Sequence, residues 1–442
     1  MHVTHARAAI LSVGDELTLG QTLNTNSRWL AERLASLGIL TVEHTTVPDD
    51  QAAQSAAIRR LATCVDLVIV TGGLGPTADD LTRHALADAM DDALIEDPLA
   101  LAQVESWFAA SGREMPLINR VQALRPRSAA SLSNLNGTAP GLYAAFTTGD
   151  NSSSIFCLPG PPREMMPMFE AQVLPRLAPP SGRTVRTRVL HCFGIGESDL
   201  ATRLGPLMDR TRTPLVGTTA SAGVVSCRIR YEGELSAEEA DQALDDTERQ
   251  VRGAAGDFIF GSGAQSLAEV VLTLLKERHQ RLAVVESCTG GLLGALITDT
   301  SGASSAFEGG LVTYSNQLKQ DLVGVDPKLL EQHGAVSSEV AQAMAVGGLK
   351  RLNADHCLAI TGIAGPDGAV VASQTRPAKP VGTVYIARAS KTGQGLSTES
   401  RHFRFFSDRH SIRDWSAKSA LAMLRFHLLN LGHVRLLRQT DA

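Results

Sequence analysis

Short apolar runs that end in glycine or serine and lead into helical patterns constrain the fold of this chain most strongly. Each run is rich in valine, isoleucine, leucine or alanine, as expected of a buried parallel strand: residues 8–13 (AAILSV), 66–73 (DLVIVTGG) and 281–287 (RLAVVES). Between the first two runs, residues 24–37 place leucines at helical spacing after an Asn/Thr/Ser cap. Strand, helix and strand in succession predict a parallel sheet covered by helices.

Length and composition narrow the class of protein. A chain of 442 residues is long enough for about three domains of roughly 150 residues each. Its net charge of -5, from 41 basic and 46 acidic residues, gives no overall attraction to nucleic acid or to an anionic membrane. The start lacks the apolar core of a signal peptide, so we expect a cytoplasmic protein that contacts no membrane. The six cysteines form no CxxC pair, which argues against a disulfide framework or a cysteine zinc site.

Changes in pattern divide the chain into three segments. We expect an α/β protein with two three-layer domains, each built on a parallel-rich sheet, and a small α+β domain between them. The expected domains occupy residues 1–175, 176–262 and 263–442. In the small domain we expect strands at 185–193 and 224–231, and helices capped by Ser198 and Ser236. Its second helix is acidic and is interpreted as a solvated face. The last helix of the chain carries a stripe that we expect to face the core: Trp415, Ser419, Met423, Phe426 and Leu429.

A glycine-rich loop at 70–82 (VTGGLGPTADDLT) is the first candidate for chemistry. It leaves a strand through glycines and reaches a helix, and we expect Asp79 and Asp80 in the first turn of that helix. Glycines let backbone amides approach a phosphate, and a helix start adds a partial positive field. Since a carboxylate cannot itself bind phosphate, Asp80 is assigned to a divalent cation that bridges to it. The alternative is an ordinary tight turn with acidic helix capping.

Other loops of the first domain are expected at the same edge of its sheet, because loops that follow parallel strands gather at one crevice. Asp15, Glu16 and Asp49 are candidate further metal ligands, and their alternative role is that of helix N-terminal or turn carboxylates. The candidate ligand-binding residues of this crevice are Gly72, Gly73, Gly75, Pro76, Thr77, Asn136, Gly137, Thr138, Pro159 and Gly160.

The third segment combines a potential nucleophile and a potential base. ESCTGG at 286–291 puts Ser287 at the carboxyl end of a strand, where open α/β sheets place their ligands. TYSNQLK, ending at Lys319, follows on a neighbouring element, and the pairing indicates covalent catalysis rather than binding alone. The alternatives are that Ser287 caps a helix, that Lys319 is a solvated charge and that Tyr314 is a core aromatic.

These motifs resemble those of the CinA family over nearly the whole chain. GDELTLGQTLNTNS, GGLGPTADDLT, NGTAPG and LPGPPREM resemble its molybdopterin-binding-like N-terminal domain, and ESCTGG, TYSN, GAVS, TGIAGPDG and KPVGTV resemble its nicotinamide-nucleotide amidase domain. The resemblance implies a metal-dependent ADP-ribose pyrophosphatase, a KH-like middle domain and an amidase that deamidates nicotinamide mononucleotide. The chain departs from the family pattern in GDE for GTE, in TADD for TPDD, and at 369–378, where the family has a short glycine-rich loop.

Amide hydrolysis requires attack on the carbonyl, stabilisation of the oxyanion and protonation of the leaving ammonia. The resemblance implies that Ser287 attacks, with amides of the CTGG turn facing the oxyanion. Lys319 is the expected base, since burial depresses the pKa of a lysine, and Tyr314 is expected to relay or orient the proton. Cys288 is the rival nucleophile, because a helix N-terminus activates a thiolate; its alternative role is structural.

Further residues of the third segment are candidate substrate contacts. Ser337 is interpreted first as a helix N-cap, and Lys379 is the basic residue expected to contact phosphate. The candidate substrate-binding residues are Cys288, Thr289, Gly290, Gly291, Ser315, Asn316, Thr361, Gly362 and Gly365.

The resulting hypothesis is a bifunctional enzyme of pyridine-nucleotide salvage that forms a homodimer. Its partners would be small nucleotides, its first domain would need a divalent metal ion of unknown identity, and its amidase would need no cofactor. In one alternative the first domain binds a molybdopterin or a nucleotide without cleaving it. In another the chain is an interaction protein of DNA uptake or recombination, although its mild negative charge and the lack of a GxxG clamp between basic residues count against nucleic acid.

Overall fold

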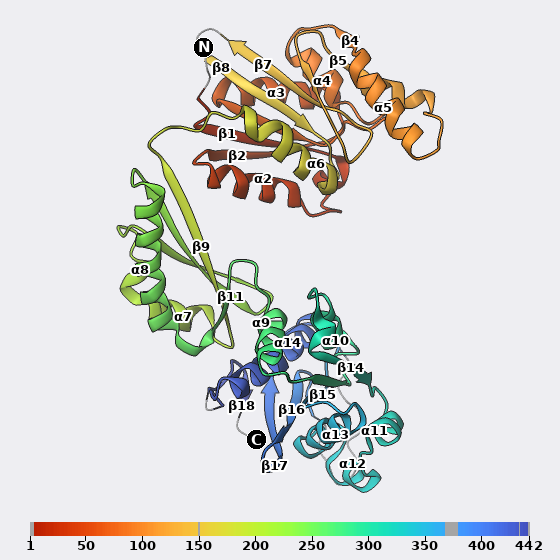
Figure 1. The fold of residues 1–442 in the computed structure, drawn as a ribbon, viewed down its shortest axis with the longest axis vertical. Coiled ribbons are helices and arrows are strands. Elements are labelled where there is room, and N and C mark those ends of the chain that lie inside the picture. Colours follow the sequence, from red (N-terminus) through yellow and green to blue (C-terminus); the bar gives the residue numbers. More distant parts are fainter. Residues whose placement is uncertain (1–3, 149–150, 367–378, 433, 441–442) are drawn as a thin grey trace. The chain divides into compact units, whose positions relative to one another are not determined.

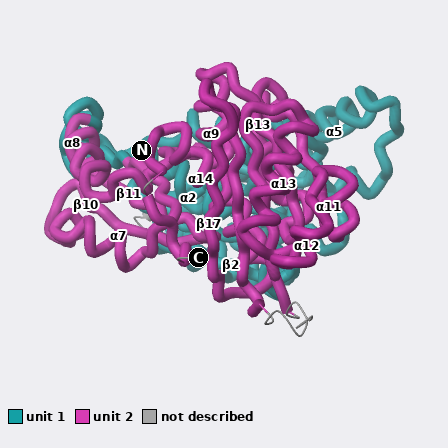
Figure 2. The backbone as a smooth tube through the Cα atoms, turned by 90° about the horizontal axis from the view of Figure 1, so that it is seen from below, with its two compact units in different colours: residues 1–186, 232–241 teal, residues 187–231, 242–442 magenta. Residues whose placement is uncertain are grey.

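The computed structural model describes residues 4–148, 151–366, 379–432 and 434–440, which form two compact units (Figures 1 and 2). The first unit runs to residue 186 and includes 232–241, whereas the second comprises 187–231 and 242–442. The two units therefore share the middle segment of the chain. Each contains a six-stranded sheet with parallel strands at its centre or one side and helices on its faces, which confirms the predicted α/β class.

The first unit contains a six-stranded sheet with the order β2-β1-β3-β8-β7-β6. Its strands are β1 (Arg7–Val13), β2 (Leu40–Val47), β3 (Leu67–Thr71), β6 (Ala130–Leu132), β7 (Gly141–Thr148) and β8 (Asn151–Leu158). Strands β2, β1, β3 and β8 are parallel, and β7 and β6 add antiparallel pairs at one side. A separate pair joins β4 (Leu94–Glu96) to β5 (Leu124–Pro126).

Helices cover both faces of this sheet, as Figure 1 shows. Alternate residues of β1 enter two cores: Leu11 packs with Ile58 of α3 and Leu86 of α4, whereas Ile10 packs with Leu30 of α2 and Met165 of α6. The parallel strands are therefore buried on both sides, which explains their uninterrupted apolar sequences. The helices are α1 (Asp15–Thr18), α2 (Thr25–Ser36), α3 (Gln51–Cys64), α4 (Thr82–Ala89), α5 (Pro98–Ala110) and α6 (Pro162–Met168).

The middle segment is a small α+β fold with a four-stranded sheet of order β10-β11-β9-β12. Its elements are β9 (Thr184–Phe193), α7 (Glu197–Leu204), β10 (Leu215–Ser221), β11 (Val224–Gly233), α8 (Ala237–Ala255) and β12 (Ile259–Ser262). Strands β10 and β12 were not predicted, because β10 ends in small polar residues and β12 runs into glycine and serine.

Of the two caps predicted in this segment, one is confirmed. The amide of Glu239 donates to Ser236 Oγ at 3.2 Å, and the Ser236 amide donates to the Glu239 carboxylate at 2.9 Å, a capping box. The prediction for Ser198 is wrong, because α7 begins at Glu197 after Gly196 and no side chain caps it.

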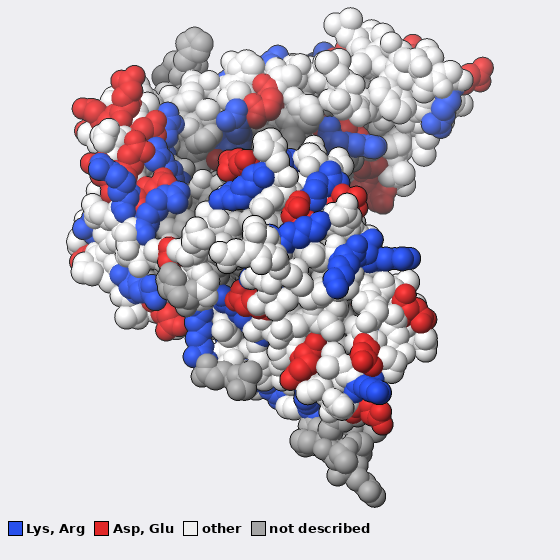
Figure 3. All heavy atoms as spheres, turned by 60° about the horizontal axis from the view of Figure 1, so that its bottom comes forward, with Lys and Arg blue, Asp and Glu red and all other residues white. Residues whose placement is uncertain are grey.

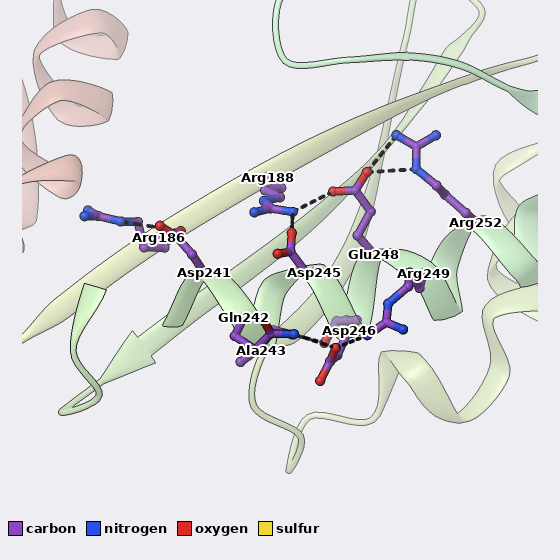
Figure 4. A network of polar contacts seen from close by, with 11 residues as sticks. Arg186, Arg188, Asp241, Gln242, Ala243, Asp245, Asp246, Glu248, Arg249 and Arg252 are labelled. Atoms are coloured by element: carbon purple, nitrogen blue, oxygen red, sulfur yellow. Dashed lines mark hydrogen bonds and ion pairs between the residues drawn. The ribbon is translucent and has the colours of Figure 1, made fainter. Parts of the chain in front are cut away.

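The acidic helix α8 is held by ion pairs and is not merely solvated (Figure 4). Arg188 of β9 pairs with Asp245 and also with Glu248, the latter at 3.1 Å, and Arg252 pairs with Glu248 at 2.7 Å. The arginines of β9 and of α8 itself thus balance much of the negative charge of this helix.

The C-terminal domain is built on a second six-stranded sheet, with the order β14-β13-β15-β16-β17-β18. Strands β14, β13 and β15 are parallel, and the remaining pairs are antiparallel. The strands are β13 (Leu282–Glu286), β14 (Phe307–Val312), β15 (His356–Gly362), β16 (Thr383–Thr392), β17 (Gly395–Arg404) and β18 (Gln439–Thr440).

Two helical layers cover this sheet. Helices α9, α10 and α14 pack on one face, and α11, α12 and α13 pack on the other. The expected core stripe of α14 is confirmed for Ser419, Met423 and Phe426, whereas Trp415 is only partly buried and Leu429 lies exposed after the helix end. The helices are α9 (Leu267–Glu277), α10 (Leu292–Thr298), α11 (Asn316–Val323), α12 (Pro327–His333), α13 (Ser338–Arg351) and α14 (Arg409–Leu428).

Buried Arg425 of α14 ties the end of the middle segment to the C-terminal sheet. Its guanidinium donates to the carbonyl oxygen of Asp257 at 2.8 Å and to that of Ile259 at 2.6 Å. Phe193 and Phe260 of the middle segment lie in the same apolar core as α9 and α14.

The surface carries charges of both signs. Lys and Arg side chains alternate with Asp and Glu on the face drawn in Figure 3, in keeping with the small net charge. Within the described residues, no helix is both long and apolar enough to cross a membrane.

We predict that Gly347→Ala destabilises the C-terminal domain, because a Cβ at Gly347 of α13 would lie 1.8 Å from the carbonyl oxygen of Val323 in α11. Overpacking of this kind costs about 1–3 kcal/mol. Gly253→Ala in exposed α8 is the control: its Cβ would meet no atom within 4 Å, so it should raise stability by about 0.5–1 kcal/mol. Urea unfolding followed by circular dichroism measures both variants, and an unchanged midpoint for Gly347→Ala would contradict this packing.

Candidate functional site

Ser287 and Lys319 meet at the carboxyl end of the C-terminal sheet. Ser287 directly follows β13, and its amide donates to the carbonyl oxygen of Ile360 in β15 at 2.9 Å. Lys319 lies on α11 and points back toward the strand, so that its Nζ is 3.1 Å from Ser287 Oγ. The structure thus brings together the nucleophile and the base proposed from the sequence.

Lys319 is buried, and its amino group is surrounded by oxygen atoms without a compensating negative charge. Its side chain donates to the carbonyl oxygens of Thr313 at 2.8 Å and Tyr314 at 3.4 Å, and only 1% of the residue is exposed. No carboxylate of the described residues forms an ion pair with it. Burial lowers the pKa of Lys319 to about 8, so an appreciable neutral fraction exists near neutral pH.

Glu286 organises the turn that follows the nucleophile. Its buried carboxylate accepts hydrogen bonds from the amides of Gly291 at 3.0 Å, Leu293 at 3.0 Å and Gly294 at 2.8 Å. The carboxylate therefore caps the start of α10 and leaves those amides unavailable to a ligand. Sequence reasoning did not predict this capping role of Glu286, whose signal was a carboxylate directly before the serine of the motif.

The remaining amides of the turn define the candidate oxyanion site. Gly290 donates to the carbonyl oxygen of Ser287 at 3.1 Å, so neither glycine of the motif offers a free amide. This narrows the expectation that amides of the CTGG turn face the oxyanion to the first two residues of the turn. Of its amides, those of Cys288 and Thr289 donate to no acceptor in the described part of the chain. Both lie directly after the nucleophile, as an oxyanion site requires.

Cys288 has the properties of a structural cysteine. The residue is 5% exposed, and burial raises the pKa of its thiol to about 12. A thiol with such a pKa holds almost no thiolate at neutral pH and is a poor nucleophile. The helix start therefore does not activate Cys288, and Ser287 is the nucleophile that the geometry favours.

Tyr314 is exposed, and its hydroxyl is directed to an arginine rather than to Lys319. Arg409 donates to Tyr314 Oη at 3.3 Å, whereas only the backbone carbonyl of Tyr314 contacts Lys319. Among the described residues, the phenol therefore has no hydrogen bond through which it could relay a proton to Lys319. Among the neighbouring candidates, Ser315 caps α11 by accepting from the Leu318 amide at 3.1 Å, and Asn316 is exposed in the first turn.

Two arginines of α14 that the sequence reasoning missed lie at this site. Arg409 also donates to the carbonyl oxygen of Gly365 at 2.5 Å, and Arg413 donates to that of Thr289 at 2.7 Å. Their spacing of four residues at the start of a helix was the signal that could have revealed them, since it puts both on one helical face. They bring positive charge to a site in which, of the described residues, Lys319 is the charged group in contact with Ser287.

The other predicted residues of this domain have mainly structural contacts. Thr361 Oγ1 donates to the carbonyl oxygen of Ala335 at 2.7 Å, and a Cβ at Gly362 would lie 2.9 Å from the Thr383 carbonyl oxygen. Ser337 is confirmed as the N-cap of α13. Lys379 donates to the carbonyl oxygen of Val336, and the unusual segment 369–378 lies outside the described residues.

In the first unit, the loops after β1, β2, β3 and β8 lie at the carboxyl ends of the parallel strands, as predicted. Asn26 of α2, which the sequence reasoning missed, joins two of these loops. Its Nδ2 donates to Thr71 Oγ1 at 3.0 Å and to the carbonyl oxygen of Gly160 at 2.7 Å. The carbonyl oxygen of Pro159 accepts from Thr71 Oγ1 at 3.1 Å.

The glycine-rich loop contains Asp80, but at a different position from the one predicted. Helix α4 begins only at Thr82, so Asp79 and Asp80 lie in the turn before the helix and not in its first turn. The Asp80 carboxylate accepts from the amide of Thr77 at 2.9 Å and from the Thr77 hydroxyl. Asp80 therefore closes its own turn, the role foreseen in the alternative interpretation.

The candidate metal ligands are only partly gathered. The amide of Asp15 donates to the Asp49 carboxylate at 3.0 Å, and the amide of Asp49 donates to that of Asp15 at 3.2 Å. Burial raises the pKa of Asp49, and the carboxylates of Asp15, Glu16 and Asp79 raise it further. Across the described residues, however, no three His, Cys, Asp or Glu side chains form a metal-ligand set. The residues as placed do not fit a metal ion, so no catalytic step is derived through one.

The NGTAPG loop surrounds a buried carboxylate that the sequence reasoning missed. Glu164 of α6 accepts from Asn134 Nδ2 at 2.9 Å, and a Cβ at Gly137 would lie 1.9 Å from the Glu164 carboxylate. Thr138 Oγ1 accepts from Gln122 at 3.2 Å. Glycine at 137 is thus required by close contact with Glu164.

Sequence comparison matches three family models to consecutive parts of this chain between residues 9 and 428. Residues 9–179 match the "probable molybdopterin binding domain", 187–261 match the "damage-inducible protein CinA KH domain" and 264–428 match the "CinA C-terminal domain".

A competence-damage inducible protein of Symbiobacterium thermophilum is 43% identical over 432 residues, which cover 96% of this chain and 99% of the relative. A CinA-like protein of Synechococcus sp. strain RCC307 is 41% identical over 430 residues, covering 97% and 100%. The crystal structure of CinA from Thermoplasma acidophilum is 30% identical, covers 39% of this chain and 99% of its own, and has a TM-score of 0.36.

Proposed function

Because this chain belongs to the CinA family over nearly its full length, we propose that its C-terminal domain hydrolyses the amide of nicotinamide mononucleotide to nicotinate mononucleotide and ammonia. The observation that carries the proposal is the contact of 3.1 Å between Lys319 Nζ and Ser287 Oγ, made by a buried lysine without a counter-ion. The choice of this particular amide rests on the sequence resemblance.

The reaction begins with neutral Lys319, which accepts the hydroxyl proton of Ser287 while Ser287 Oγ attacks the amide carbon. The resulting oxyanion accepts hydrogen bonds from the amides of Cys288 and Thr289. Lys319, now charged, donates its proton to the nitrogen of this tetrahedral intermediate. The C–N bond then breaks, ammonia leaves, and the acyl group remains as an ester of Ser287. Water then attacks the ester with Lys319 again as base, and the carboxylic acid is released.

The surroundings of Lys319 suit both of its protonation states. The carbonyl oxygens of Thr313 and Tyr314 hold the ammonium that forms after proton transfer, while burial keeps its pKa low enough for the neutral form to return. Arg409 is exposed beside the reacting groups and supplies positive charge for the phosphate of the nucleotide. The ring of Tyr314 is exposed next to it and offers a surface for the pyridine ring.

For the first unit we propose a nucleotide site at the carboxyl ends of β1, β3 and β8, with hydrolysis of ADP-ribose, the activity that the sequence resemblance implies, as its reaction. The glycine-rich loop and the four nearby carboxylates support this proposal. The second candidate is a binding module for a pterin or a nucleotide. This candidate is favoured by two observations. The described residues hold no complete set of metal ligands, and the Asp80 carboxylate already accepts a hydrogen bond from the Thr77 amide.

We predict that Ser287→Ala abolishes ammonia release from nicotinamide mononucleotide, because the attacking oxygen is lost. Removal of such a group commonly lowers kcat by several orders of magnitude, about 10⁴-fold or more. Cys288→Ala is the matched control and should retain most of the activity, since the thiol is buried and protonated. An active Ser287→Ala together with an inactive Cys288→Ala would reverse the assignment of the nucleophile.

The pH dependence of the amidase tests the role of Lys319. Because the lysine must be neutral to accept a proton, kcat/KM should rise about tenfold per pH unit on the acid side and level off above about pH 8. Lys319→Arg should be inactive throughout, since a guanidinium remains charged, and Lys319→Met should be inactive yet folded. Lys328→Arg, on exposed α12, is the control. A flat profile between about pH 6 and 9 would rule out this base.

We predict that Asp80→Asn reduces ADP-ribose hydrolysis and leaves amidase activity unchanged, because the substitution replaces the charged acceptor of the Thr77 amide and hydroxyl in the glycine-rich loop by a neutral one of nearly the same size. The measurement is release of AMP from ADP-ribose with and without a chelator. An unchanged rate in Asp80→Asn would contradict this role of Asp80, and an unchanged rate with chelator would exclude a metal-dependent reaction. A wild-type chain that releases no AMP would favour the binding module.

A further inference from the structure

Arg83 is a buried cation whose position the proposed reactions do not explain. It lies in the first turn of α4, is 1% exposed and forms no ion pair within the described residues. Its guanidinium instead donates to three backbone carbonyl oxygens of the preceding loop: Leu74 at 2.6 Å, Gly75 at 3.1 Å and Asp80 at 3.4 Å. Burial of an unpaired charge is costly, so a residue of this kind requires a specific reason.

The carbonyls held by α4 determine where the amides of the loop point. In a trans peptide the C=O and the next N–H point in opposite directions. Thr82 Oγ1 donates to the Gly72 carbonyl oxygen at 2.8 Å and the Thr82 amide donates to that of Gly73 at 3.1 Å, while Arg83 holds that of Leu74. Three successive carbonyls are thus fixed toward α4, and the next three amides point away from it.

Those amides belong to Gly73, Leu74 and Gly75, and none of them donates a hydrogen bond within the described residues. Three consecutive amides directed to one side form a concavity that binds anions. The conformation depends on glycine, since Gly72 and Gly73 have φ of 106° and 65°.

We infer that Arg83 is a positioning residue that holds the amides of Gly73, Leu74 and Gly75 in register for a phosphate group of the nucleotide. Arg83 lies behind the loop and does not touch the ligand; it acts by fixing peptide planes. The inference rests on the proposed nucleotide site of the first unit, and it names phosphate as the group recognised there. A lysine at this position has one ammonium and lacks the planar fork that spans separate carbonyls.

The test uses the full chain as wild type, Arg83→Lys and the matched control Arg125→Lys. Arg125 is also partly buried in this unit and gathers carbonyl oxygens, among them that of Ala129 at 2.7 Å, but these belong to a different loop. Calorimetric titration with ADP-ribose and with inorganic pyrophosphate, in the presence of chelator, measures binding without turnover. We expect Arg83→Lys to raise the Kd at least tenfold for both ligands and Arg125→Lys to change it less than twofold.

A second readout separates positioning from a general loss of structure. With ¹⁵N-glycine labelling, pyrophosphate should shift the amide resonances of Gly73 and Gly75 in the wild type and not in Arg83→Lys, while amidase activity of the same samples stays equal. If Arg83→Lys does not fold, Thr82→Val provides an isosteric variant that frees the Gly72 carbonyl and should weaken binding in the same direction.

The outcomes distinguish this inference from the proposed hydrolysis. Weaker binding by Arg83→Lys supports the positioning role even if the wild type never cleaves ADP-ribose. Unchanged binding and unchanged amide shifts in Arg83→Lys overturn it, although hydrolysis by the wild type would still support the proposed function. A wild-type chain that binds neither ligand overturns the phosphate site itself.

Discussion

The desolvation of Lys319 is the physical constraint on which the C-terminal site depends. An ammonium with three oxygen neighbours and no carboxylate is less stable than it would be in water, and this instability makes the lysine a usable base. A nearby Asp or Glu would stabilise the charged form and remove the effect. The two carbonyl oxygens accept hydrogen bonds from the ammonium, but their partial charges stabilise it less than a full negative charge would. The lysine can therefore still lose its proton. The apolar packing of α11 and α13 against the sheet therefore has a chemical consequence as well as a structural one.

The two candidate sites use their backbone amides in a similar way, although their folds are separate. In the C-terminal domain, Glu286 occupies three amides at the start of α10 and leaves those of Cys288 and Thr289 free. In the first unit, Thr82 and Arg83 hold carbonyls instead, which frees the amides of the glycine-rich loop. In both cases the residues that prepare the turn are buried and are not those that would contact a ligand.

Sequence patterns predicted those features that depend on local order along the chain. The buried strands, the capping roles of Ser236 and Ser337 and the placement of Ser287 at a strand end all follow from short-range patterns. The contact of Arg413 with Thr289 could not be predicted in the same way, because only tertiary folding brings α14 to a turn 124 residues earlier in the chain. The sequence predicted Asp80 in the first turn of α4. In the structure Asp80 lies in the turn before the helix, where its carboxylate accepts a hydrogen bond from the Thr77 amide. Strand β12 was not predicted because it is only four residues long and two of these are glycine and serine, which give no strand pattern.

Helix α14 connects two features that are distant in space. Arg409 and Arg413 at its first turns contact the loops of the candidate active site, and Arg425 near its other end holds backbone carbonyls of the middle segment. The sixteen residue steps from Arg409 to Arg425 span about 24 Å at about 1.5 Å per step. Because a packed helix is stiff along its axis, the two ends cannot shift independently. One helix thus fixes the guanidinium groups at the candidate site and the end of the middle segment in a single register, so a displacement of the helix along its axis would alter both sets of contacts.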